Sequence, residues 1–258
     1  MKKHLHILLA AGFLFSACQP RAQEPPPPRQ LPTPVPTGIE MPEHSADEDI
    51  VVHTGYTASY NHQTLVPDWV AWELTADEAN GTIDQERLFS RDPEVRFPKA
   101  SREDYSNSGW DKGHMAPRAD MKWSRRALTE SDYFTNICPQ NKKMNAGAWN
   151  KIESLTRAIA RRYGSVYVVT GPIFKEYAHG TIGDANVMVP DRFYKALAIR
   201  LDGQYHTVAF LVENTPQDRT PHYYALTVDE VEALISRNLF PQLPEESECT
   251  FDWKIWER

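Results

Sequence analysis

Asp111-Lys112-Gly113-His114 is the stretch that decides how this chain folds and what chemistry it carries, together with Asn136-Ile137-Cys138-Pro139-Gln140 and the segment from Asn145 to Glu153. A neutral histidine can accept a proton from water near pH 7. An amide oxygen with a carboxylate nearby can hold a hydrated Mg²⁺. Together these residue types suit hydrolysis of a phosphodiester, in which water is activated and the charge of the phosphate is neutralised.

His114 is the candidate general base that takes a proton from the attacking water. Gly113, directly before it, lets the backbone approach another element closely. Lys112 and Arg87 are candidates for binding the phosphate, the first as a point charge and the second as a planar fork. Three other arginines compete with Arg87 for this role: Arg91, Arg96 and Arg102. For a single histidine, a structural hydrogen bond is the default interpretation. For His114 the surrounding motif favours catalysis instead.

Asn145 is the candidate metal ligand, at the predicted start of a helix, where asparagine is also a common N-cap. Glu153 lies eight positions further on, on roughly the same helix face but about 12 Å along the axis. It would therefore reach the metal only through water or by leaning back toward the N-terminus. The alternative for Glu153 is a surface glutamate paired with Lys151 or Arg157.

Asn136 and Gln140 complete the candidate site. Both amides are expected to orient backbone or water around it, although buried amides at a strand end can be purely structural. The rest of the chain lacks a Gly-rich phosphate loop, a Cys or His pair at zinc spacing and a Gly-x-Ser-x-Gly motif. Their absence removes the main competing chemistries.

The N-terminal part is predicted to lie outside the folded body. Residues 1–18 combine a basic start, an apolar run and small residues before Cys18, which is typical of a secretory signal. Its Ser-Ala-Cys ending resembles the lipobox of bacterial lipoproteins, and an ordinary signal peptide is the alternative. Residues 19–49 are a Pro-rich linker, and residues 50–258 form the catalytic domain. We therefore expect an exported protein, held at a bacterial cell envelope by a lipid anchor at Cys18 or secreted.

The formal charge of −7 is unfavourable for binding phosphates, but its distribution is uneven. Residues 87–164 hold 16 Lys and Arg against 9 Asp and Glu, a balance of +7, and the remainder holds 12 against 26, or −14. The positive excess coincides with the motif segments, which favours a polyanionic substrate.

Cys138 and Cys249 could pair in an exported protein, but a small buried core residue is the favoured interpretation of Cys138.

Periodic apolar patterns predict the secondary structure. Residues 56–60 and 69–74 are predicted as a strand pair, residues 132–137 as a strand that ends at Pro139, and residues 165–171, 193–199 and 207–212 as further strands. Residues 145–162 are predicted as a helix, and a second helix runs from Thr227 to about Arg237 behind a capping box. Residues 76–109 are expected to be loop. Because strands outnumber helices without alternating with them, we predict an α+β domain whose central, largely antiparallel sheet is flanked by helices.

The motifs resemble those of the DNA/RNA non-specific endonuclease family, the sugar-non-specific branch of the ββα-metal nucleases, over about residues 50–245. The likeness implies a ββα-metal motif, a single Mg²⁺, for which Mn²⁺ can substitute, and cleavage of DNA and RNA. It makes His114 the base, Asn145 the direct metal ligand and Glu153 a ligand through water, and it aligns Arg87 with a phosphate-binding arginine. The family motif has Arg where this chain has Lys112, which could lower activity or change substrate preference.

Two other functions stay open. A catalytically silent surface lipoprotein could use the same scaffold to bind nucleic acid, and a phosphodiesterase of narrower range could act on small diesters but not on long polymers. The sequence also leaves open whether the chain forms a homodimer.

Overall fold

The computed structural model describes residues 37–257; the predicted signal, the lipid anchor at Cys18 and most of the predicted linker lie outside the described residues. The strands are β1 (Asp49–Val52), β2 (Thr57–Asn61), β3 (Val66–Thr75), β4 (Asp111–His114), β5 (Ile137–Gln140), β6 (Ser165–Ile173), β7 (Thr181–Ile182), β8 (Val187–Met188), β9 (Arg192–Leu201), β10 (Gln204–Glu213) and β11 (Ala225–Leu226). The α-helices are α1 (Ala76–Ala79), α2 (Arg102–Tyr105), α3 (Arg125–Ser131), α4 (Lys142–Met144), α5 (Asn150–Tyr163), α6 (Val228–Ile235) and α7 (Trp253–Trp256). Short turns of 3-10 helix are η1 (Arg118–Asp120), η2 (Phe134–Asn136), η4 (Pro221–Tyr224) and η5 (Glu245–Ser247), and η3 (Asn145–Trp149) is a π-helical turn.

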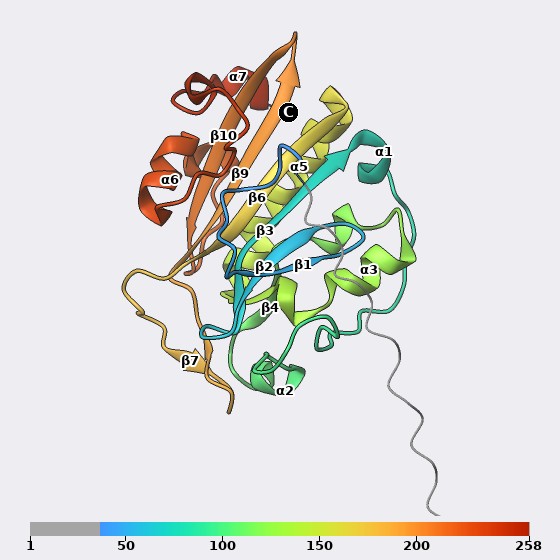
Figure 1. Ribbon diagram of the computed structural model, residues 1–258, viewed down its shortest axis with the longest axis vertical. Helices are drawn as coiled ribbons and strands as arrows, with labels where there is room; N and C mark the ends of the chain where they lie inside the picture. Colours follow the sequence, from blue (N-terminus) through green and yellow to red (C-terminus); the bar gives the residue numbers. More distant parts are fainter. Residues whose placement is uncertain (1–36, 258) are drawn as a thin grey trace, which may run out of the picture. The chain divides into compact units, whose positions relative to one another are not determined.

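A seven-stranded antiparallel sheet organises the described residues, with strand order β1-β2-β3-β6-β9-β10-β11 (Figure 1). In β3, Val70, Trp72 and Leu74 belong to one core cluster. Trp69 and Ala71, at the alternate positions, belong to another. Because successive strand side chains point to opposite faces, this alternation places a core on each side of the sheet. The predicted α+β class with an antiparallel sheet is confirmed.

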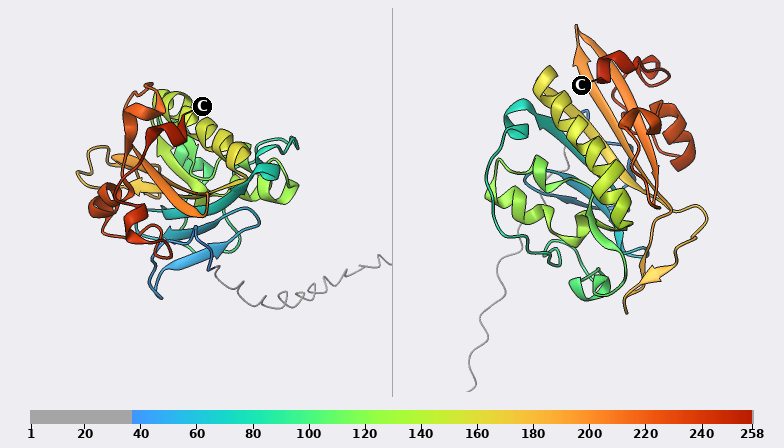
Figure 2. Two further views of the ribbon diagram at one scale, coloured as in Figure 1. Left: turned by 90° about the horizontal axis from the view of Figure 1, so that it is seen from above. Right: turned by 180° about the vertical axis from the view of Figure 1, so that it is seen from behind.

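Helices cover the two faces of the sheet differently. The apolar stripe of α5, including Ile152, Leu155 and Ile159, packs into the larger core, whereas Val228 and Val231 of α6 pack into the smaller one. Figure 2 shows α5 running along the sheet on one side and α6 lying on the other, against the β9 and β10 edge. The sheet therefore separates the surroundings of α5 from those of α6.

β4 and β5 form a separate two-stranded antiparallel ladder in which His114 faces Ile137 and Gly113 faces Cys138. The predicted close approach at Gly113 is present: a Cβ atom at this position would lie 2.0 Å from Oε1 of Gln140. The chain leaves β5 and enters α4 after a single residue, whereas β4 and β5 are joined by residues 115–136, which contain η1, α3 and η2.

The helix after β5 begins earlier than predicted, and its N-cap is Asn141, whose side chain accepts hydrogen bonds from the backbone N–H groups of Lys143 and Met144. Asn145 lies inside the helical stretch with φ −57° and ψ −50°, so its interpretation as an N-cap is wrong. The π-helical turn η3 follows, and the backbone oxygen of Gln217 approaches it closely. A Cβ at Gly147 would lie 2.6 Å from that oxygen, so only glycine fits there without displacement.

The predicted strand over residues 132–137 is also wrong in its bounds. Residues 134–136 form the 3-10 turn η2, and β5 begins at Ile137 and includes Pro139. A two-stranded ladder accepts proline where the backbone nitrogen faces away from the partner strand. Pro139 lies opposite Lys112, and its carbonyl accepts a hydrogen bond from the amide of Asn214 at 3.1 Å.

Other expectations have mixed outcomes. The strand predictions over residues 165–171, 193–199 and 207–212 are confirmed by β6, β9 and β10, and the capping-box helix by α6. The predicted loop of residues 76–109 contains the short helices α1 and α2, each opened by a capping box. Residues 37–48, predicted as linker, contact the body: Met41 is 3% exposed, and Glu43 N–H donates to the Asn238 carbonyl at 2.9 Å.

The two remaining cysteines are both free thiols. Cys138 is fully buried in the larger core, as expected, and Cys249 is exposed. Among the helices of residues 37–257, none combines the length and apolar character needed to cross a membrane.

Replacing Gly113 by alanine should destabilise the domain by about 1–3 kcal/mol, because the added methyl group overlaps the side chain of Gln140. Urea unfolding measures the loss. The double variant Gly113→Ala with Gln140→Ala is the control, and it should recover most of the lost free energy if the overlap is the cause. Equal stability of Gly113→Ala and the parent chain would contradict the close packing of this ladder.

Candidate active site

His114 forms a hydrogen bond through Nε2 to Oδ1 of Asp132 at 3.0 Å. The histidine side chain is 11% exposed, and the carboxylate is 1% exposed. Because an ionised carboxylate only accepts hydrogen bonds, Nε2 of the neutral ring must carry the proton. The lone pair of His114 is therefore on Nδ1, which makes that atom the proton acceptor.

Two further groups of the chain fix the carboxylate of Asp132. Its Oδ2 accepts a hydrogen bond from Nη1 of Arg118 at 2.5 Å and one from the backbone N–H of Leu88 at 3.0 Å. The residue is also the C-cap of α3. The carboxylate thus ties β4, the turn η1 and the segment around residue 88 to one another, and it holds the imidazole ring in one orientation.

The pKa of His114 lies below its ordinary value. Burial disfavours the charged ring and is the main cause, and the guanidinium groups of Arg87 and Arg118 lower the pKa further. The hydrogen bond and charge of Asp132 oppose this shift. The imidazole is consequently neutral at pH 7, which is the form a general base needs.

Phe89 gathers the two predicted phosphate-binding cations beside His114. Its ring centroid lies 5.4 Å from that of His114. The guanidinium carbon of Arg87 lies 5.9 Å from the Phe89 centroid, and Nζ of Lys112 lies 5.4 Å from it. Lys112 also lies 5.9 Å from the ring of Tyr105. The structure therefore brings Arg87, Lys112 and His114 together, and Arg87 is exposed to solvent.

Asn145 contacts the β4–β5 ladder from the helix. Its Nδ2 donates to Oδ2 of Asp111 at 3.2 Å, which leaves the amide oxygen for another partner. One turn later, the indole Nε1 of Trp149 donates to the backbone oxygen of His114 at 3.3 Å. The candidate base and the candidate metal ligand are thus carried by two elements in direct contact.

The oxygen donors around Asn145 fit a hydrated Mg²⁺. Asp111 pairs with Gln140 across the ladder, and the Gln140 side chain is fully buried. Neither Oε1 nor Nε2 of Gln140 has a hydrogen-bond partner among residues 37–257. Water molecules of a hydrated cation would satisfy such an amide, and carboxylate and amide oxygens are ligands that Mg²⁺ accepts.

Glu153 faces a buried group of charges behind this site. Because a π turn takes in one residue more than an α turn, the eight positions from Asn145 to Glu153 span close to two turns and share one helix face. Burial raises the pKa of Glu153 to about 7, opposed by Lys195 and Arg157 and supported by Asp120. Lys151, the predicted surface partner, instead pairs with Asp218 at 2.7 Å.

Lys195 is the unexpected member of this group. The side chain is 1% exposed, with Nζ 4.8 Å from the ring centroids of both Trp72 and Trp149. Nζ donates to the backbone oxygen of Met115 at 3.3 Å, next to His114. Burial lowers the pKa of Lys195 to about 8, although the charge of Glu153 opposes the shift. Arg157, the other predicted partner of Glu153, pairs with Asp120 at 2.9 Å.

Asn136 is fully buried, and all of its hydrogen bonds are to backbone. Nδ2 donates to the carbonyl oxygens of Ala116 and Ser131 at 2.8 and 2.9 Å, and Oδ1 accepts from Ala116 N–H at 2.8 Å. The side chain therefore shapes the turn that follows His114. These contacts are those of an amide that orients backbone, one of the two roles expected for it.

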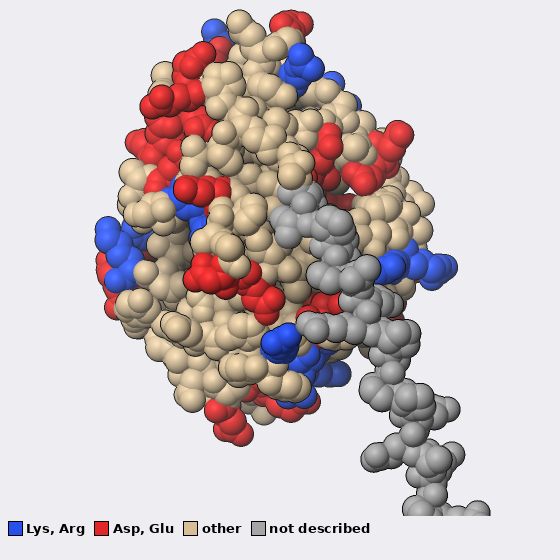
Figure 3. Space-filling model, viewed as in Figure 1, with Lys and Arg blue, Asp and Glu red and all other residues tan. Residues whose placement is uncertain are grey.

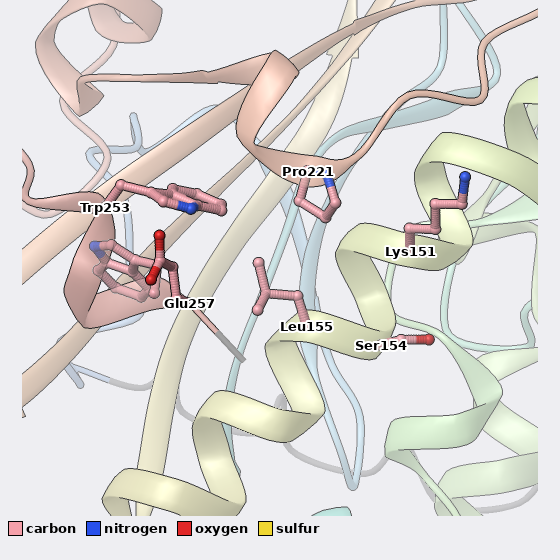
Figure 4. Close-up of a pocket in the computed structure, with 7 residues that line it drawn as sticks. Lys151, Ser154, Leu155, Pro221, Trp253 and Glu257 are labelled. Atoms are coloured by element: carbon pink, nitrogen blue, oxygen red, sulfur yellow. The ribbon is translucent and has the colours of Figure 1, made fainter.

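The pocket in Figure 4 lies elsewhere, between α5 and the C-terminal residues around α7. Its lining combines apolar and polar side chains: Lys151, Ser154, Leu155, Pro221, Trp253, Trp256 and Glu257. None of the predicted site residues lines it.

Sequence reasoning missed Asp132, Arg118, Phe89, Lys195 and the contact of Asp111 with Asn145. Asp132 stands 18 positions after His114, with no periodic relation to it. A buried carboxylate next to a buried arginine was the available signal, but only tertiary structure shows which histidine they face.

Two paired antiparallel strands followed by a helix, with a carboxylate-held histidine on the first strand and a candidate amide ligand on the helix, define the ββα-metal class. The chain belongs to the DNA/RNA non-specific endonuclease family, whose family model matches residues 37–246. This confirms the family resemblance that the motifs carry.

Known proteins agree with this membership. The chain is 33% identical over 207 residues to the mitochondrial nuclease EXOG of Xenopus laevis, covering 74% of this chain and 58% of the relative. It is 33% identical over 175 residues to human mitochondrial endonuclease G, covering 63% and 59%. A crystal structure of the EndoG/EndoGI complex matches with a TM-score of 0.72 and 27% identity, covering 78% of this chain and 89% of that one.

The chain thus spans somewhat under three fifths of the length of these two curated relatives. Their names contradict the expected location. We predicted export to a bacterial cell envelope or secretion, and both relatives are mitochondrial nucleases, so that prediction is wrong. A basic start before an apolar run is too general a pattern to separate one targeting route from another.

Replacing Asp132 by asparagine should lower the pKa of His114 further, because the carboxylate that stabilises the imidazolium is removed while burial and the two arginines remain. A pH titration of the His114 ring signals by NMR measures the shift. The acid limb of any His114-dependent rate should move to lower pH as well, since the neutral ring persists further into acid.

Asp49→Asn is the matched control, because Asp49 bonds the more exposed His62 at 2.7 Å. It should leave the titration of His114 unchanged. An unchanged pKa of His114 in Asp132→Asn would show that the two side chains do not interact in solution.

Proposed function

We propose that this chain is a metal-dependent endonuclease that hydrolyses phosphodiester bonds of DNA and RNA without sequence specificity. The observation that carries the proposal is the neutral, carboxylate-held imidazole of His114 on β4, packed against the helix that bears Asn145. Family membership supports the same substrate class. The cations gathered at Phe89 support a polyanionic substrate.

In this mechanism Nδ1 of His114 accepts a proton from the water that attacks phosphorus, while Asp132 stabilises the imidazolium that results. Arg87 binds the phosphate with its planar fork, and Lys112 adds a second positive charge on the same side. A proton leaves the water as its oxygen bonds to phosphorus, and the bond to the departing ester oxygen breaks. Asn136 keeps the turn after His114 in place.

A bound Mg²⁺, or Mn²⁺ in its place, would neutralise the developing phosphate charge and assist the departing oxygen. Asn145 would hold it directly, and Glu153 would act through water. The positive charges of Lys195 and Arg157 favour the ionised form of Glu153.

The decisive experiment incubates the full chain with supercoiled plasmid and with RNA, in Mg²⁺ or in EDTA. We expect cleavage of both polymers in Mg²⁺ and none in EDTA. His114→Ala should reduce the rate by about 10²- to 10⁴-fold, the usual contribution of a general base, while the fold is retained. Asn145→Ala should lose activity mainly at low Mg²⁺ concentration, because metal binding is weakened.

His62→Ala is the matched control, since His62 also bonds an aspartate but lies outside the site. Intact polymers in Mg²⁺ would overturn the proposal. Binding without cleavage would then favour a silent binding protein, in which Lys112 replaces the family's arginine. Cleavage of small diesters alone would favour a phosphodiesterase of narrower range.

A further inference from the structure

Three carboxylates converge on the side of the sheet that α6 covers. Asp229 and Glu232 stand three positions apart on α6, which places them on one helix face. Glu248 directly follows η5. One carboxylate oxygen from each residue lies within 4.8 Å of the other two. Acidic side chains also gather over α6 and the segment leading to α7 in Figure 3.

Glu248 is the member that distinguishes this cluster from an ordinary acidic surface. The residue is 3% exposed, and its Oε1 is enclosed without a hydrogen-bond partner among residues 37–257. A buried carboxylate oxygen normally has a donor, because its loss of water is otherwise uncompensated. Here a carboxylate oxygen of Glu248 lies within 4.8 Å of oxygens of two further carboxylates.

In the described part of the chain, these charges have no arginine or lysine as a counter-ion. The ion pairs found in residues 37–257 include none with Asp229, Glu232 or Glu248. Burial, together with the carboxylates of Glu232 and Asp229, raises the pKa of Glu248 to about 8. The three groups therefore repel one another whenever all are ionised, and a cation is the partner that removes this repulsion.

We propose that Asp229, Glu232 and Glu248 form a binding site for one Ca²⁺ ion, separate from the catalytic centre. Ca²⁺ accepts carboxylate oxygens at about 2.3–2.6 Å, so oxygens on opposite sides of the ion lie about 4.6–5.2 Å apart. The three carboxylates lie within 4.8 Å of one another, which is close enough to share one ion of this size. Ca²⁺ tolerates the irregular geometry of side chains that come from separate elements, whereas Mg²⁺ demands a nearly ideal octahedron.

The remaining contacts assign the site a structural role. Oε1 of Glu232 accepts a hydrogen bond from Leu239 N–H at 2.6 Å, which leaves its second oxygen for the ion. Beside Glu248, the carbonyl of Ser247 accepts from the hydroxyl of Thr207 on β10 at 2.6 Å. Bound Ca²⁺ joins α6 to the segment after η5 and so fixes the chain that leads to α7.

The test is calorimetric titration of Ca²⁺ into the full chain after metals have been removed with EDTA and dialysis. The parent chain for this test carries Asn145→Ala, which weakens the proposed catalytic metal site. Adding Glu248→Gln should lower the number of bound Ca²⁺ ions by one and abolish the corresponding rise in melting temperature. Glu246→Gln is the matched control, because Glu246 is exposed on the same segment and should leave the binding unchanged.

Glu248→Gln should be at least as stable as its parent without metal, because a neutral amide relieves the repulsion. If this variant does not fold, Asp229→Asn serves as the second test, with the same expected loss of one ion. Unchanged Ca²⁺ stoichiometry in the folded variant, or no bound Ca²⁺ in the parent, would overturn the proposal. In Mg²⁺, plasmid cleavage by Glu248→Gln in the otherwise unaltered chain should equal that of the parent, which separates this site from the proposed catalysis.

Discussion

The carboxylate of Asp132 is the group on which the arrangement of the candidate active site depends. It is almost completely buried, yet it accepts hydrogen bonds from the imidazole of His114, the guanidinium of Arg118 and the backbone of Leu88. A buried charge is tolerated only when it is fully bonded, so the carboxylate holds all three groups in place. The same contact leaves Nδ1 of His114 as the proton acceptor and brings the segment with Arg87 to it.

The helix contributes the second constraint. A π-helical turn between Asn145 and Trp149 is uncommon, and here the Gln217 carbonyl accepts a hydrogen bond from Ala148 N–H at 3.2 Å and closely approaches Gly147. The irregular turn lets Asn145 face Asp111 on β4 while Glu153 faces the buried Lys195 on the sheet. The large antiparallel sheet thus serves as a rigid support, and both irregular elements of the site are built against its larger core.

Much of this arrangement could be predicted from the sequence, because alternating and 3.6-residue patterns act locally. The strands β6, β9 and β10 and the antiparallel sheet followed from such patterns, and the close approach at Gly113 followed from the glycine itself. The helix start did not, because Asn141 and not Asn145 caps the helix and the π turn packs against the backbone of Gln217. The sequence did not predict Asp132 and Lys195 for a related reason. No periodic pattern in the sequence marks a buried charged residue, and only the folded structure shows which group it pairs with. Asn136 was expected to orient backbone or water, and its three side-chain hydrogen bonds are all to backbone groups.

Chemical rescue tests the central claim most directly. His114→Ala is assayed on supercoiled plasmid in Mg²⁺ with and without added imidazole, at several pH values. If the ring at this position removes the proton from water, neutral imidazole should restore cleavage in proportion to its concentration, and imidazolium should not. A variant that cuts plasmid at the parent rate without imidazole would contradict the account.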